Sequence, residues 1–87
     1  MSWSLDRPTR AGGITCVPIV DMVATVNGGL SHIAVHGGKR PVLILVFSQG
    51  EVDGIDLSGR RLDVKTIEAR YPGAIKRAEA LVAEGAR

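Results

Sequence analysis

Three glycine pairs divide the apolar front of the chain into strand-sized segments. The pairs are Gly12-Gly13, Gly28-Gly29 and Gly37-Gly38, and glycine favours tight turns because it adopts positive φ without steric cost. After Leu62 the apolar residues recur at three- and four-residue spacing, which is typical of an amphipathic helix. The pattern predicts an α+β domain that is β-rich over residues 14–57 and helical over residues 63–85.

The first predicted strand covers residues 14–26, which are dense in Val, Ile and Thr and so suit a pleated surface. Pro18 cannot donate a ladder hydrogen bond, so we expect it at an edge or a bulge. Asp21 marks a bend or the end of the strand. The alternative is a helix over residues 21–27, with Asp21 as N-cap and Gly28 after its last turn.

Three more segments complete the predicted sheet. Residues 30–36 alternate in polarity and predict a half-buried strand, whereas residues 41–47 are uninterruptedly apolar, which favours a central strand covered on both faces. In residues 51–57, Val52 and Ile55 fall on opposite faces of a regular strand. Asp53-Gly54 is therefore either a bulge or a hairpin turn.

Two helices are predicted to follow. Asp63 is a suitable N-cap, and Pro72 interrupts the apolar stripe, so we expect one helix over residues 64–70 and a second that ends near residue 84. These helices would cover one face of a small, three- or four-stranded, mainly antiparallel sheet. Residues 1–13 predict a flexible N-terminal arm, and residues 14–87 predict a single domain.

Composition and charge restrict the classes of partner. The chain has 87 residues, a formal net charge of +2, and one residue each of Trp, Tyr and Phe. So few aromatic residues disfavour base stacking, and the charge is too small for a phosphate-backbone binder. Nucleic acid is thus an unlikely partner, although six basic residues would supply such a surface if they shared one face: Arg7, Arg10, Lys39, Arg40, Arg60 and Arg61.

Membrane insertion and secretion are also disfavoured. The polar N-terminus lacks the apolar core of a signal peptide. Residues 14–35 are interrupted by Pro18 and Asp21, so they contain no run of the roughly 20 apolar residues that a span requires. Cys16 is the only cysteine and excludes a disulfide within the chain, which fits the reducing cytoplasm.

Two places in the sequence are candidate metal or anion sites. His32 and His36 have a spacing that suits zinc on a helix, but on a strand their side chains would be roughly 13 Å apart, too far to share one ion. With Cys16 they remain the candidate ligands, but no metal or other cofactor is predicted. The turn formed by Gly37, Gly38, Lys39 and Arg40 could bind an anion through backbone amides and cations, although a solvated hairpin turn is the simpler interpretation.

No catalytic constellation is present in the sequence. Glu51, Asp53 and Asp56 form the nearest cluster of carboxylates, but no nucleophile accompanies them. Charges that protect an edge strand from aggregation explain them more simply. We therefore expect a protein that is not an enzyme.

The functional prediction depends on the apolar segment 41–47. One helical layer cannot cover both faces of a sheet, and a second copy of the chain related by a two-fold axis is the simplest cover for the other face. The candidate interface residues are Trp3, Val42, Ile44 and Val46. The sequence thus predicts a non-enzymatic interaction or regulatory module that is homodimeric. The alternative is a small-ligand, anion or metal-binding protein that uses the histidine, cysteine and glycine-turn residues above.

Overall fold

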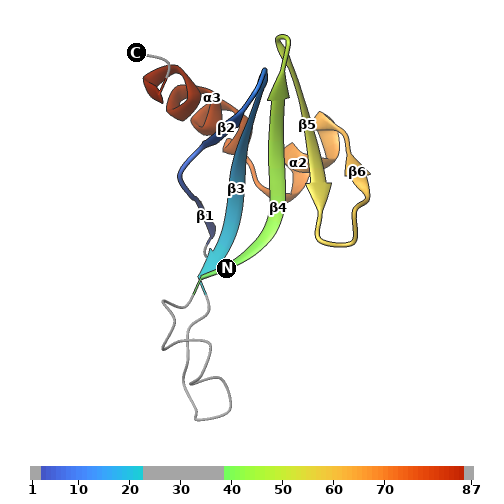
Figure 1. Ribbon diagram of the computed structural model, residues 1–87. Coiled ribbons are helices and arrows are strands. Elements are labelled where there is room, and N and C mark those ends of the chain that lie inside the picture. The colour runs from blue at the N-terminus through green and yellow to red at the C-terminus, as the bar shows by residue number, and fades with distance from the viewer. Residues whose placement is uncertain (1–2, 23–38, 86–87) are drawn as a thin grey trace.

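The chain forms an antiparallel sheet of six strands with two C-terminal helices (Figure 1). The computed structural model describes residues 3–22 and 39–85. Along the chain the strands and helices are β1 (Trp3–Leu5), β2 (Thr9–Ala11), β3 (Ile14–Met22), β4 (Lys39–Ser48), β5 (Glu51–Asp56), β6 (Arg61–Leu62), α2 (Val64–Arg70) and α3 (Ala74–Gly85). The α+β class is confirmed, and the sheet has more strands than the three or four predicted.

The additional strands are short and lie at the two edges of the sheet. The order is β1-β3-β4-β5-β6, and β2 also pairs with β3. Residues 3–5 pair with the second half of β3 and residues 9–11 with its first half. The segment predicted as a flexible arm therefore supplies two strands. Three-residue strands are too short to show a polarity pattern, so they cannot be predicted from alternation.

Pro18 lies inside the sheet, in β3, rather than in an edge strand. Its carbonyl oxygen accepts a hydrogen bond from the Asp6 N–H at 2.9 Å, between the end of β1 and the start of β2. In an antiparallel ladder the N–H and C=O of one residue point to the same neighbour. The missing N–H of Pro18 therefore points toward Asp6, at the end of β1, and the ladder between β3 and β4 loses no bond.

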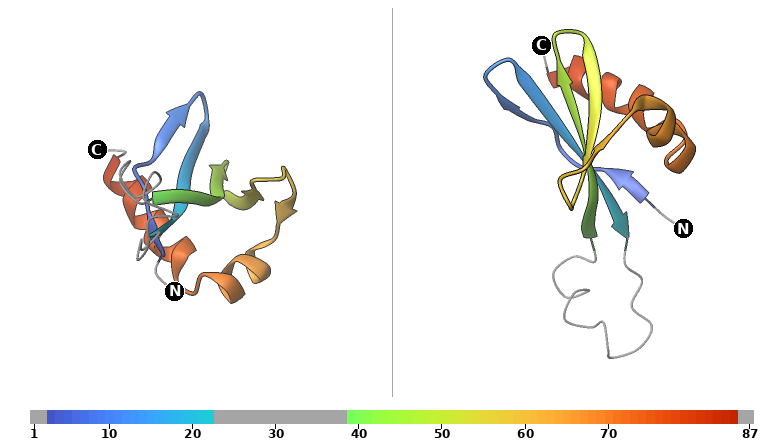
Figure 2. Two further views of the ribbon diagram at one scale, coloured as in Figure 1. Left: turned by 90° about the horizontal axis from the view of Figure 1, so that it is seen from below. Right: turned by 90° about the vertical axis from the view of Figure 1, so that its right-hand side faces the viewer.

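The apolar segment 41–47 forms most of β4, the middle strand of the sheet. Leu43 and Leu45 pair with Ile19 and Val17, and all four side chains are buried. They face the helices, which both lie on the same side of the sheet (Figure 2). The predicted single helical layer is confirmed, but the expected cover on both faces of this strand is absent among the described elements.

β5 is regular through Asp53-Gly54, so the predicted bulge and the predicted turn are both wrong. Its pairing with β4 continues without a shift from Ser48–Glu51 to Leu43–Asp56. Val52 and Gly54 belong to the helix-facing side, and Ile55 belongs to the other side. The apparent change of parity arises because this strand places apolar residues on both faces, one of which lacks helical cover.

The helices begin and end close to the predicted residues. The Asp63 carboxylate accepts a hydrogen bond from the Thr66 N–H at 2.9 Å and caps α2. The chain turns at Tyr71-Pro72, Gly73 has φ of 84°, and α3 follows. Neither α2 nor α3 is long and apolar enough to cross a membrane, and the described residues contain no other helix. The strand predicted over residues 30–36 lies outside the described residues, as does the part of the strand-or-helix alternative beyond residue 22.

Candidate functional site: the open face of the sheet

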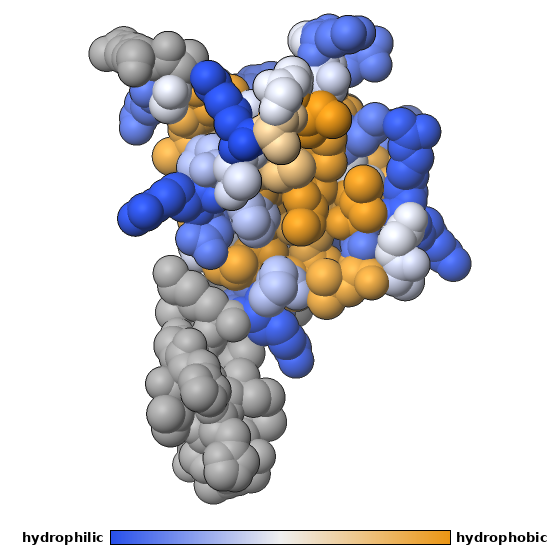
Figure 3. Space-filling view, in the orientation of Figure 1, coloured by the Kyte–Doolittle hydropathy of each residue, from blue (hydrophilic) through white to orange (hydrophobic). Residues whose placement is uncertain are grey.

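The side of the sheet opposite the helices carries a continuous group of apolar residues. Side chains alternate between the two faces of a strand, so the neighbours of the buried Val17, Leu43 and Leu45 point away from the helices. We call the part of this side next to Ile14–Pro18 the open face; its apolar residues are Ile14, Cys16, Pro18, Ile44, Val46 and Ile55. Val20, the next β3 residue on this side, is buried. Figure 3 shows hydrophobic side chains gathered in the middle of this face, with hydrophilic residues on both flanks.

The strand register makes this group contiguous. Cys16 pairs with Val46, and Ile44 lies between Pro18 of β3 and Ile55 of β5. Ile14 and Ile55 are 43% and 37% exposed, and the other four side chains are half-buried. None of the six belongs to the core cluster packed under the helices. The open face is therefore an apolar surface that no described element covers.

Charged residues border the open face at both edges of the sheet. Asp53 lies opposite Val46, and its carboxylate accepts a hydrogen bond from the Arg61 guanidinium of β6 at 3.0 Å. Glu51 lies beside them on β5, at the Ser48 end. At the other edge, Asp6 lies next to Pro18, and β2 contributes the uncharged Thr9 and Ala11 opposite Cys16 and Ile14. The ion pair is solvent-exposed, so it adds little to stability, but it neutralises Asp53 and Arg61 within the chain.

Both edges of the sheet are poor templates for another strand. The edge formed by β1 and β2 is interrupted at Pro8, which has no N–H to donate, and the opposite edge is the two-residue strand β6. Short and interrupted edge strands hinder edge-to-edge pairing. The open face is thus a more suitable contact surface than either edge.

The structure separates the four predicted interface residues. Ile44 and Val46 lie on the open face. The pairing of β3 with β4 shifts after Ile19–Leu43 and skips Val42, which packs against the core on the helix side. In a regular strand Val42 would lie on the same face as Ile44 and Val46. The bulge instead places it on the helix side.

Trp3 lies on the helix side. Its ring meets the Tyr71 ring edge to face at 5.6 Å between centroids, and the Arg77 guanidinium carbon is 5.2 Å from the Trp3 ring centroid. Trp3 also packs against the core cluster. These contacts attach β1 to the helices, so Trp3 has a packing role in this structure.

The predicted metal and anion residues are not brought together in the described part of the chain. Cys16 is a free, half-buried thiol on the open face. His32, His36, Gly37 and Gly38 lie outside the described residues. Lys39 and Arg40 are the first residues of β4 rather than part of a turn. Among residues 3–22 and 39–85, no group of three His, Cys, Asp or Glu residues could hold a metal ion.

Asp56 stabilises the β5–β6 turn. Its carboxylate accepts hydrogen bonds from the Ser58 hydroxyl at 2.7 Å and from the Ser58 and Arg60 N–H groups at 2.9 Å each. These bonds, the Ser58 hydroxyl foremost, lower the pKa of Asp56. Asp56 faces the helix side, away from Glu51 and Asp53, so the three carboxylates do not converge.

The predicted basic residues are divided between the two edges of the sheet. Arg7 and Arg10 lie at the β1/β2 edge, and Arg60 and Arg61 lie at or beside β6, at the opposite edge. One arginine of the second pair, Arg61, is already bonded to Asp53. These four residues do not form one basic surface.

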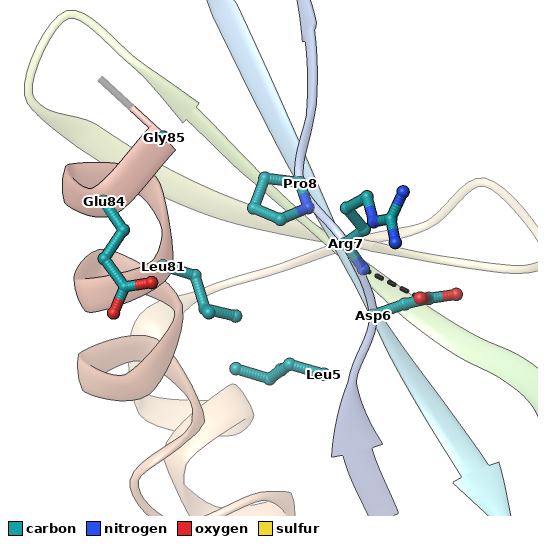
Figure 4. A pocket seen from close by; sticks show the side chains of 7 residues that line it. All are labelled: Leu5, Asp6, Arg7, Pro8, Leu81, Glu84 and Gly85. Atoms are coloured by element: carbon teal, nitrogen blue, oxygen red, sulfur yellow. Dashed lines mark hydrogen bonds between the residues drawn. The ribbon is translucent and has the colours of Figure 1, made fainter. Parts of the chain in front are cut away.

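A shallow groove lies between α3 and the segment that joins β1 to β2. Leu5 and Leu81 point toward one another across its floor (Figure 4). Its rim carries both signs of charge, Arg7 on one side and Glu84 on the other, and the Asp6 carboxylate accepts a hydrogen bond from the Arg7 N–H at 2.8 Å. The sequence could not predict this groove, because it depends on the pairing of residues 3–11 with β3.

Comparisons with known proteins do not add a function. No family model, curated protein or solved structure matches the chain. The functional argument therefore depends on the geometry of the open face.

Proposed function

We propose that this protein is a non-enzymatic interaction module that forms a homodimer through the open face. The observation that carries the proposal is the contiguous apolar surface of β3, β4 and β5, which no described element covers. Apolar surfaces of this kind are typical of protein–protein interaction sites. A second copy of the chain is a suitable cover, because closed two-fold dimers are the commonest soluble oligomers.

The polar groups of the described residues support a binding role over a catalytic one. The Asp56 and Asp63 carboxylates are engaged in backbone hydrogen bonds, and Asp53 is paired with Arg61. Cys16 is surrounded on the open face by apolar side chains, with no base paired to it in the ladder. The lone cysteine also supports a cytoplasmic location, where thiols stay reduced.

The size of the open face suggests a weak dimer. Four strands, β2 to β5, span about 19 Å at about 4.8 Å each, and about six residues along the longer strands β3 to β5 span about 20 Å, whereas β2 has three residues. The projected area is thus roughly 400 Å², about half of the ~800 Å² per partner of a standard stable interface. We expect a reversible dimer whose population depends on protein concentration.

The experiment that tests this proposal introduces a charge on the open face. Ile44→Glu buries a carboxylate in the proposed interface, so the concentration of half-dimerisation measured by light scattering should rise at least tenfold. Val64→Glu is the matched control, because Val64 is 44% exposed and lies on α2, away from the open face. Circular dichroism of both variants checks that the fold is retained. Equal dimerisation of the two variants would count against the open face as the contact surface.

A further inference from the structure

We infer that the two copies pack face to face with the two-fold axis parallel to the strands and located between β3 and β4. This inference depends on the proposed homodimer and specifies its arrangement. It follows from two features of the open face: where its charges lie, and which strands are the most apolar.

The charges select the direction of the axis. On the side of β5 and β6 the border charges are Glu51, Asp53 and the paired Arg61, and at the opposite edge Asp6 lies next to Pro18. A two-fold axis between the sheets that ran perpendicular to the strands would place β5 over the β5 of the partner subunit. It would bring Asp53 close to the partner's Asp53. Like charges in an interface are repulsive. An axis parallel to the strands instead places β5 over the partner's β2, where Thr9 and Ala11 are uncharged.

The apolar residues select the position of the axis. On the open face, β3 carries Ile14, Cys16 and Pro18, and β4 carries Ile44 and Val46. The neighbouring strands are more polar, with Thr9 on β2 and Asp53 on β5. An axis between β3 and β4 stacks the two most apolar strands on each other and therefore buries the most apolar surface.

This arrangement brings the two Cys16 residues near the axis. Cys16 and Val46 are direct ladder partners, so Cys16 would lie over the partner's Val46. The two β3 strands would be offset by one strand spacing, about 5 Å, with the sheets about 10 Å apart. Because both Cys16 side chains point into the interface, the two thiols approach one another more closely than the two backbones do.

The test is crosslinking of the native thiol with a short bismaleimide. The reagent attaches to Cys16 of a free monomer and joins the second thiol when the dimer re-forms. We expect a covalent dimer on denaturing gels at concentrations where light scattering shows dimer. The double variant Cys16→Ala, Asp53→Cys should give none, because its thiols would be separated by three strand spacings, about 14 Å, in addition to the distance between sheets.

The outcomes separate this inference from the proposed function. A dimer that crosslinks through Cys16 and not through a cysteine at position 53 supports the arrangement. A dimer that crosslinks through a cysteine at position 53 and not through Cys16 overturns the arrangement. A dimer without a Cys16 crosslink, although a monofunctional maleimide labels Cys16 fully, also overturns it. Both outcomes leave the proposed homodimer intact. A monomer at all concentrations overturns both, and would direct attention to a different protein as occupant of the open face.

Discussion

Gly54 of β5 lies directly beneath Ile67 of α2. A Cβ atom added to Gly54 would be 2.7 Å from the Cδ1 atom of Ile67 and 3.5 Å from the Cδ1 atom of Leu43. Ile67 is completely buried. The absence of a side chain at Gly54 thus lets α2 approach the sheet closely, and this contact helps to fix which face the helices cover.

Gly54→Ala should destabilise the fold. The new methyl group must displace Ile67, and overpacking of this kind costs about 1–3 kcal/mol. Adding Ile67→Val removes the Cδ1 atom that the methyl group meets, so the double variant should recover part of the loss. Urea denaturation measures each free energy of unfolding. Gly13→Ala is the control, because nothing lies within 4 Å of a Cβ at that position; equal effects at residues 13 and 54 would contradict the packing argument.

Trp3→Ala should also lower stability, because Trp3 attaches β1 to the helices. The edge-to-face contact with Tyr71 contributes about 0.5–1.5 kcal/mol beyond the buried area, and the Arg77 contact adds about 0.5–1 kcal/mol. Together these two contacts predict a loss of about 1–2.5 kcal/mol in thermal or urea unfolding, and the lost burial of the ring adds to it. Trp3→Phe should retain most of the stability. If Trp3→Ala is as stable as the wild type, β1 is not held by the helices.

The cap of α2 predicts an acid-dependent loss of stability. Hydrogen bonds from Thr66, first from its side chain and then from its backbone N–H, lower the pKa of Asp63 below its ordinary value. A carboxyl group whose pKa is lower in the folded chain stabilises it above the unfolded value, and this contribution disappears as the pH falls through the folded value. Asp63→Ala should therefore be less stable than wild type at pH 7, and the difference should decrease toward pH 2, to about that between Asp63→Asn and Asp63→Ala.

The control for that titration is Asp63→Asn, which retains a capping side chain without a titratable group. Its stability at pH 7 should exceed that of Asp63→Ala, and the gap between the two variants should not change with pH. Asp56, whose pKa is also lowered, titrates in every variant and cancels in these differences. A pH-independent gap between wild type and Asp63→Ala would exclude the titration of this cap.

Polarity patterns predicted the helical part of the chain well. The Asp63 cap and the break at Tyr71-Pro72 depend on local chemistry that is visible in the sequence. Within β3, the alternation of Thr15, Val17 and Ile19 with the open-face residues Ile14, Cys16 and Pro18 was also present in the sequence. It gave no signal for an interface, because both sets are apolar enough to be read as core.

The remaining features depend on tertiary pairing. The short strands β1, β2 and β6 exist because β3 and β5 offer them partners. Val42 leaves the open face because of a register shift between β3 and β4, and no local pattern predicts such a shift. The regular course of β5 through Gly54 follows from the proximity of Ile67, a residue of a later helix.

The proposed homodimer is best tested by the molecular mass in solution, measured by light scattering over a wide range of protein concentration. For a reversible homodimer the mass should rise from the 9.2 kDa of one chain toward twice that value as concentration increases. High salt should not abolish this rise, because the contact is apolar. A mass that stays at 9.2 kDa up to millimolar concentration would contradict the proposed homodimer.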